Sequence, residues 1–109
     1  MNEQKANVYF NGELAGRLTK RSGKYEFIYD ETYFNDPGKP PISLSFPKDN
    51  REYRSDILFS FFFGLLAEGE NKQLQCRLLK IDERDNFTRL IKTAGSDTIG
   101  AVTVREVEE

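Results

Sequence analysis

Hydrophobic and polar positions alternate along the first third of the chain, which is the pattern of strands with one buried face. Asn11 and Gly12 separate two such runs, 6–10 and 14–18. Both residues tolerate the positive φ angles of a type I′ turn, so the two runs predict a β-hairpin. After a second turn, residues 24–29 alternate again. The chain is therefore expected to open with an antiparallel meander of three strands.

The middle of the chain begins with a polar-aromatic connector, 30–34, that has room for one helical turn. Residues 35–41 predict a loop, because proline fixes φ and donates no N–H. Strict alternation over 42–46, stopped by Pro47, predicts a fourth strand. The charged residues 48–54 predict a loop that leads into the next segment.

The segment 55–69 is the most apolar of the chain and predicts a central helix. Ser55 or Asp56 can cap this helix, because a short side-chain oxygen accepts an N–H of the first turn. Gly69 is placed where such a helix would end. The apolar residues recur at spacings of three and four, which marks one helical face. They are Leu58, Phe61, Phe62, Leu65 and Leu66.

Phe59 and Phe63 fall away from that helical face. The three consecutive phenylalanines at 61–63 cannot all enter one core from a single helix. One interpretation, the commoner arrangement, is a central buried helix with other elements on several sides. The other interpretation is an exposed apolar patch that receives a partner protein.

Two more helices and a last strand complete the pattern. Residues 70–81 carry leucines at helical spacing on a polar background, and Asp85 or Asn86 caps a third helix with its apolar side chains inward. Residues 99–104 predict a strand that returns to the sheet. This order predicts an α+β fold in one domain, 1–109. Its antiparallel β-sheet combines the N-terminal meander with the C-terminal strand, and about three helices pack on it.

Composition argues against several classes of function. The chain has 109 residues, a net charge of −2 and no histidine. A general nucleic-acid binder needs a basic face, so we expect no direct nucleic-acid contact. The single cysteine, Cys76, has no histidine to activate it and no partners for a zinc site, so we interpret it as a small buried side chain. No signal peptide or membrane-spanning segment is recognisable, so we expect a cytoplasmic protein that does not contact a membrane.

Catalytic constellations are not recognisable in the sequence either. No glycine-rich phosphate loop is present, and carboxylate pairs such as Asp82 with Glu83 are typical of a solvated surface. We therefore expect a protein that is not an enzyme and that uses no cofactor and no metal.

Three motifs together resemble the amino-terminal domain of HipA-type serine/threonine kinase toxins. The segments are 41–47 (Pro-Ile-Ser-Leu-Ser-Phe-Pro), 61–69 (Phe-Phe-Phe-Gly-Leu-Leu-Ala-Glu-Gly) and 85–102, and the first hairpin also fits the family. The resemblance covers nearly the whole chain, with matching order and spacing. The structural motif positions are Asn11, Gly12, Pro41, Ser43, Ser45, Pro47, Gly95, Asp97 and Gly100.

The resemblance implies a role in a toxin–antitoxin system. In the long family members this domain precedes a kinase body with an ATP loop and catalytic aspartates, whereas the chain here ends soon after the third motif. That implies a split arrangement in which the domain is a separate protein. It would be similar to HipS of three-component systems, which binds the separately encoded kinase and restrains it. A HipB-like DNA-binding protein is usually the third component.

The expected function is a non-catalytic module that docks on a separately encoded HipA-like Ser/Thr kinase and regulates it, with neutralisation as the favoured direction. One alternative is a structural subunit that completes the kinase fold. Another is a stand-alone homodimeric domain. A direct part in phosphoryl transfer lacks support, because metal-binding carboxylates and a phosphate loop are not recognisable.

Two departures from the family pattern suggest where a partner would bind. Phe63 replaces an acidic or polar residue, and Ala67 replaces a proline. An apolar residue at a polar helix position suits a face that meets a partner, and an additional core contact explains it equally well. We take Phe59, Phe63, Ala67 and Glu68 as candidate interface residues, together with the edge of the sheet.

Overall fold

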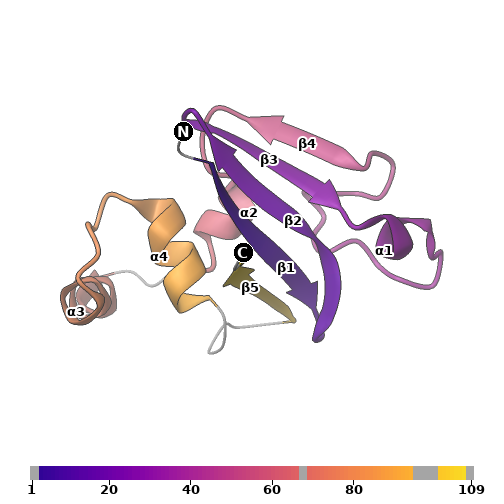
Figure 1. The fold of residues 1–109 in the computed structure, drawn as a ribbon. Helices are drawn as coiled ribbons and strands as arrows, with labels where there is room; N and C mark the ends of the chain where they lie inside the picture. The colour runs from indigo at the N-terminus through magenta and orange to yellow at the C-terminus, as the bar shows by residue number, and fades with distance from the viewer. Residues whose placement is uncertain (1–2, 67–68, 95–100, 108–109) are drawn as a thin grey trace.

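The computed structural model describes residues 3–66, 69–94 and 101–107, and its centre is an antiparallel sheet (Figure 1). Within those residues the sheet has five strands in the order β4-β3-β2-β1-β5. All neighbouring strands pair antiparallel. The strands are β1 (Gln4–Phe10), β2 (Glu13–Arg21), β3 (Lys24–Tyr29), β4 (Glu52–Ser55) and β5 (Val102–Glu106).

The opening meander is confirmed, and its first turn has the expected geometry. Asn11 and Gly12 have φ angles of 51° and 81°, as a type I′ turn requires. Ser22 and Gly23 repeat this pattern between β2 and β3, with φ angles of 51° and 77°. The turn chemistry therefore sets the register next to each turn, and the pairing of β1 with β2 shifts once more between Val8 and Tyr9.

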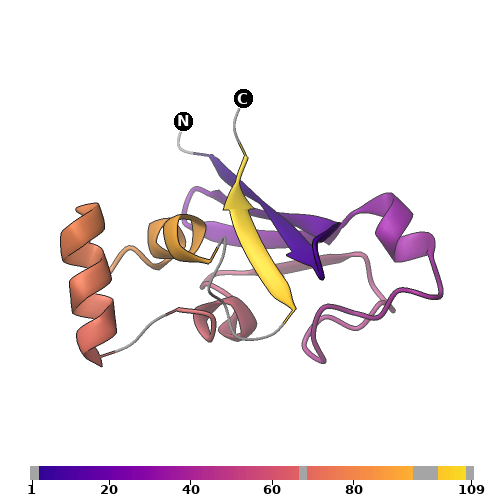
Figure 2. The same ribbon diagram turned by 90° about the horizontal axis from the view of Figure 1, so that it is seen from below.

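Four helices accompany the sheet in the described part of the chain, so the α+β class is confirmed. They are α1 (Glu31–Asn35), α2 (Ser60–Phe63), α3 (Gly69–Leu79) and α4 (Asn86–Thr93). With the molecule turned by 90°, α3 stands at one end beyond α4, and α1 lies at the opposite end (Figure 2). The chain between α1 and β4 has no regular structure and runs on the same side of the sheet as α2 (Figure 2).

The core lies between one face of the sheet and helices α2 and α4. Alternate strand residues point into it, as the period-two pattern requires. The α4 helix begins as the sequence predicts, because the Asp85 side chain accepts the backbone N–H of Thr88 at 3.1 Å. The fully buried residues include Ala6, Val8, Leu18, Phe27, Tyr29, Phe62, Phe87, Leu90 and Val104.

The prediction of one helix over 55–69 is wrong. Ser55 belongs to β4 and pairs with Tyr25, so it cannot cap a helix. The α2 helix has four residues and follows Phe59, and α3 begins at Gly69 instead of a helix ending there. The apolar residues recur at helical spacing although most of the segment is not helical. Leu58, Phe62 and Leu66 are all buried, and only Phe62 of these lies in a helix.

The prediction of a strand over 42–46 is also wrong. The Phe46 N–H donates to the Ser43 carbonyl at 3.0 Å, which closes a turn in place of a strand. The fourth strand is β4, which lies in the segment 48–54 predicted as a loop and extends to Ser55. The charged residues of β4 suggested a loop, but they lie on the exposed face of the sheet, where Arg54 pairs with Glu26 of β3 at 2.7 Å.

The final strand returns to the sheet as predicted and pairs with β1. It begins at Val102, and the first two residues of the predicted strand, 99–100, lie outside the described residues.

Candidate protein-docking surface

An aromatic cluster centred on Phe46 accounts for most of the surplus phenylalanine. The Phe46 ring is buried and lies within 6.1 Å, centroid to centroid, of five other rings. Such offset and edge-to-face pairs add to the stabilisation that burial provides. The five partners are Phe27, Tyr53, Phe59, Phe61 and Phe62.

The candidate interface residues divide between the cluster and the surface. Phe59 is half-buried and packs on Phe46 and Phe62, so its main contacts are within the domain. Phe63 keeps 41% of its surface exposed and is available to a partner. Ala67 and Glu68 lie outside the described residues.

Two exposed residues near this cluster were missed by the sequence analysis. Ile57 is 71% exposed and Leu44 is 97% exposed. We call Leu44, Ile57 and Phe63 the apolar rim, because each lies within two residues of a cluster member. The signal for Leu44 was present in the sequence, since it stands between two serines close to prolines, where turns are common.

A buried hydroxyl holds the loop that carries Leu44. The Tyr29 hydroxyl on β3 accepts the Ile42 N–H at 3.1 Å and donates to the Phe46 carbonyl. Burial raises the pKa of Tyr29 to about 12, although the bond from Ile42 acts in the opposite direction. At neutral pH this hydroxyl is protonated and can keep both bonds.

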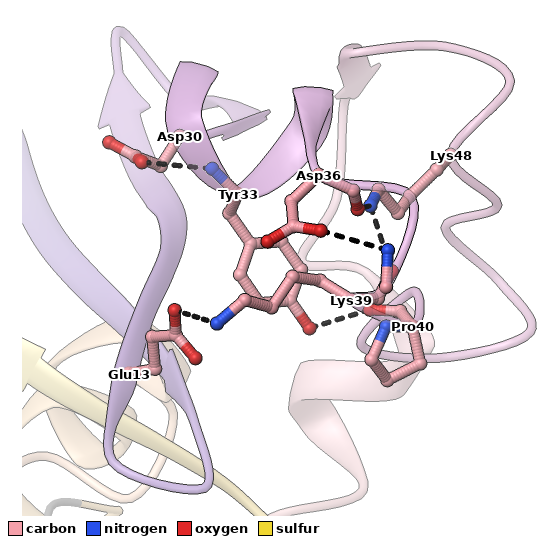
Figure 3. A network of polar contacts seen from close by, with 8 residues as sticks. Glu13, Asp30, Tyr33, Asp36, Lys39, Pro40 and Lys48 are labelled. Carbon is pink, nitrogen blue, oxygen red and sulfur yellow. Dashed lines mark hydrogen bonds and ion pairs between the residues drawn. The ribbon is translucent and has the colours of Figure 1, made fainter.

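A second tyrosine fixes the first half of the same loop. The Tyr33 hydroxyl on α1 donates to the Pro40 carbonyl at 2.5 Å, and burial raises the pKa of this tyrosine as well. Asp30 caps α1 by accepting the Tyr33 N–H at 3.2 Å (Figure 3). The cap therefore orients the helix that presents the hydroxyl to the loop.

Lys48 closes the loop from its far end. Its ammonium donates to the carbonyls of Asp36 and Lys39 at 2.7 and 2.8 Å (Figure 3). Lys39 in turn forms an ion pair with Glu13 at the start of β2. Residues 36–48 contain no regular secondary structure. The Lys48 bonds join the two ends of this loop, and the Lys39 ion pair joins the loop to β2.

The motif positions of the sequence resemblance that the structure describes lie in this loop and in the first turn. The Ser43 hydroxyl accepts the Ser45 N–H at 3.0 Å, and the Pro47 carbonyl accepts the Tyr53 hydroxyl. Pro41 is exposed beside the buried Ile42. These positions therefore shape the backbone of the loop. Gly95, Asp97 and Gly100 lie outside the described residues.

The free edge of the sheet at β5 is partly covered. The Val104 N–H donates to the Ala94 carbonyl at the end of α4 at 2.8 Å. This bond satisfies one backbone donor that an edge strand would otherwise expose. The sheet edge at β5 is therefore a less suitable docking surface than the sequence analysis expected.

The α3 helix presents a second group of exposed apolar side chains. Leu74 and Leu78 are 50% and 70% exposed, and Leu79 is also exposed. Cys76 is buried and faces the domain, so the side chains two residues to either side point away from it, about 200° round the helix. Leu74 and Leu78 thus lie on the outward face of the helix, whereas Leu79, three residues after Cys76, lies nearer to the side that faces the domain.

Groups suited to metal binding do not gather in the part of the chain that the structure describes, since no three histidine, cysteine, aspartate or glutamate side chains form a cluster there. Within the same residues, no helix has both the length and the apolar composition needed to cross a bilayer. The candidate site is therefore a small set of exposed apolar side chains beside an aromatic cluster, which suits contact with another protein.

Comparisons with known proteins agree with this architecture. The HipA N-terminal domain family matches residues 6–105. An uncharacterized protein of Haemophilus influenzae is 33% identical over 102 residues, which cover 94% of this chain and 92% of that protein. A solved structure described as the N-terminal domain of HipA toxin superposes with a TM-score of 0.72 and 29% identity, over 97% of this chain and 94% of that one.

A longer relative carries the same domain as one part of its chain. It is the Sinorhizobium fredii protein named "Putative kinase Y4mE", which is 30% identical over 97 residues. The match covers 88% of this chain and 23% of that protein, so the chain here corresponds to about a quarter of its length.

Proposed function

Because this chain belongs to the HipA N-terminal domain family, we propose that it is a non-catalytic module that docks on a separately encoded HipA-type Ser/Thr kinase and regulates it. The relative named as a kinase supports the pairing, since it joins the same kind of domain to a much longer chain. In this proposal the module acts in the cytoplasm, in a toxin–antitoxin system. A HipB-like DNA-binding protein completes that system.

The apolar rim is the observation that carries the proposal. Leu44, Ile57 and Phe63 expose large apolar side chains, and each lies within two residues of a member of the aromatic cluster. A few buried apolar anchors supply most of the affinity in typical protein interfaces, and a rigid base beneath them lowers the cost of ordering. The rim therefore provides the kind of surface on which a kinase domain could be held.

The experiment is co-expression with a tagged HipA-type kinase encoded beside this chain, followed by affinity purification. We expect wild-type chain to co-purify with the kinase. Phe63→Glu should reduce the recovered complex by about tenfold, because it places a charge in a desolvated contact. Leu74→Glu on α3 is the matched control, and the complex should survive it. If both variants still form the complex, Phe63 is not part of the interface. If the wild-type chain forms no complex, the proposal is overturned.

The direction of regulation is read from growth in the same strains. If this chain neutralises the kinase, kinase alone should arrest growth and the chain should restore it. A kinase that is insoluble without the chain would instead identify a subunit that completes the kinase fold. Homodimerisation of this chain without kinase binding would favour the stand-alone alternative.

A further inference from the structure

Leu44 is the most exposed large apolar side chain in the described residues, at 97%. It occupies the second position of the turn that Ser43 and Phe46 close with a backbone hydrogen bond of 3.0 Å. Most residue types are compatible with this position, so the turn itself has no need of a leucine. The exposed side chain also contributes nothing to the core.

The backbone on both sides of Leu44 is fixed by one group. Ile42, two residues before it, donates its N–H to the Tyr29 hydroxyl, and Phe46, two residues after it, accepts from the same hydroxyl. The side chains of Ile42 and Phe46 are themselves buried in the core. The turn is therefore held at two points, and Leu44 projects from between them.

We propose that Leu44 is an anchor residue of the docking surface and enters a leucine-sized apolar pocket of the kinase. This inference rests on the proposed function and adds the residue and the pocket chemistry. Rigid presentation supports it, because the loop is ordered during folding and little further entropy is lost on binding. The small polar neighbours Ser43 and Ser45 leave room for the pocket walls and suit a polar rim around it.

The test is calorimetric titration of the purified HipA-type kinase with variants of this chain. Leu44→Ala should weaken binding by about tenfold or more, as expected for removal of an anchor side chain. Leu44→Met, which keeps a similar apolar volume, should stay within about threefold of wild type. Leu78→Ala on α3 is the matched control, because it truncates another strongly exposed leucine, and its affinity should not change.

Tyr29→Phe separates rigid presentation from simple contact. It keeps Leu44 but removes both hydrogen bonds to the turn, so binding should weaken by about threefold to tenfold. In a Leu44→Ala background the same change should have little effect, which a double-mutant cycle measures. Circular dichroism at the assay temperature confirms that each variant is folded. Additive effects of the two substitutions would contradict rigid presentation.

The outcomes distinguish the two proposals. If wild-type chain does not bind the kinase, the proposed function and this inference both fail. If wild type binds and Leu44→Ala binds as tightly as Leu78→Ala, the inference alone is overturned.

Discussion

The loop 36–48 and helix α3 both expose leucine side chains, but they hold them differently. Tyr29, Tyr33 and Lys48 fix the loop through hydrogen bonds to its backbone. In α3, Cys76 is the only buried residue between positions 71 and 79. An irregular loop can therefore present a side chain from several fixed points, whereas this regular helix rests on a narrow contact with the domain.

The difference shows that exposure by itself does not identify a docking residue. Exposed apolar side chains occur singly on most soluble proteins. What distinguishes Leu44 is the set of buried groups that determine its position. Substitutions in the loop and in α3 should therefore differ in their effects.

Phe46→Ala should have the largest effect, because it empties the centre of the aromatic cluster beneath the loop. We expect the free energy of unfolding to fall by about 3–5 kcal/mol, as for other buried phenylalanines. Urea denaturation measures the change. Leu78→Ala should alter stability by less than about 0.5 kcal/mol, because that side chain is largely exposed. Similar losses in the two variants would contradict the contrast.

Tyr29→Phe should have a smaller effect and a distinctive pH dependence. At neutral pH it leaves the Ile42 N–H and the Phe46 carbonyl without their partner, which costs about 1–3 kcal/mol. The pKa of Tyr29 is about 12 in the fold and has the ordinary value near 10 in the unfolded chain. Its stabilising contribution is therefore fully present below pH 10 and is lost as the pH rises through 12.

Thermal unfolding between pH 9 and pH 12 measures this dependence. The wild-type melting temperature should fall more steeply above pH 10 than that of Tyr29→Phe. Tyr9→Phe is the control, because the Tyr9 hydroxyl makes no hydrogen bond with any residue that the structure describes. Parallel curves for wild type and Tyr29→Phe would show that this hydroxyl does not hold the turn.

Local sequence signals predicted the elements whose geometry is set locally. Asn11-Gly12 and the alternation around it specified the first hairpin, and Asp85 specified the start of α4. The motif resemblance also identified the family correctly. These signals succeed because turn and cap chemistry act over a few residues.

The segment 42–66 could not be predicted in the same way. Ile42 and Phe46 are buried while Leu44 between them is not, because Tyr29, at least 13 residues away in sequence, bonds to the backbone on both sides. Phe46 also packs against Phe62 of α2, a residue distant in sequence, and the segment forms this short helix instead of the long helix that the apolar spacing suggested. Tertiary contacts, which the pattern does not contain, determine this part of the fold and most of the apolar rim.

The most direct test of the central claim is hydrogen exchange of this chain, alone and bound to the HipA-type kinase. If the module docks through the apolar rim, peptides covering 42–46 and 56–63 should exchange more slowly in the complex, and peptides from α3 should exchange at unchanged rates. Protection of α3 with unchanged exchange at 42–46 and 56–63 would contradict the account and assign the docking surface to the outward leucines of that helix.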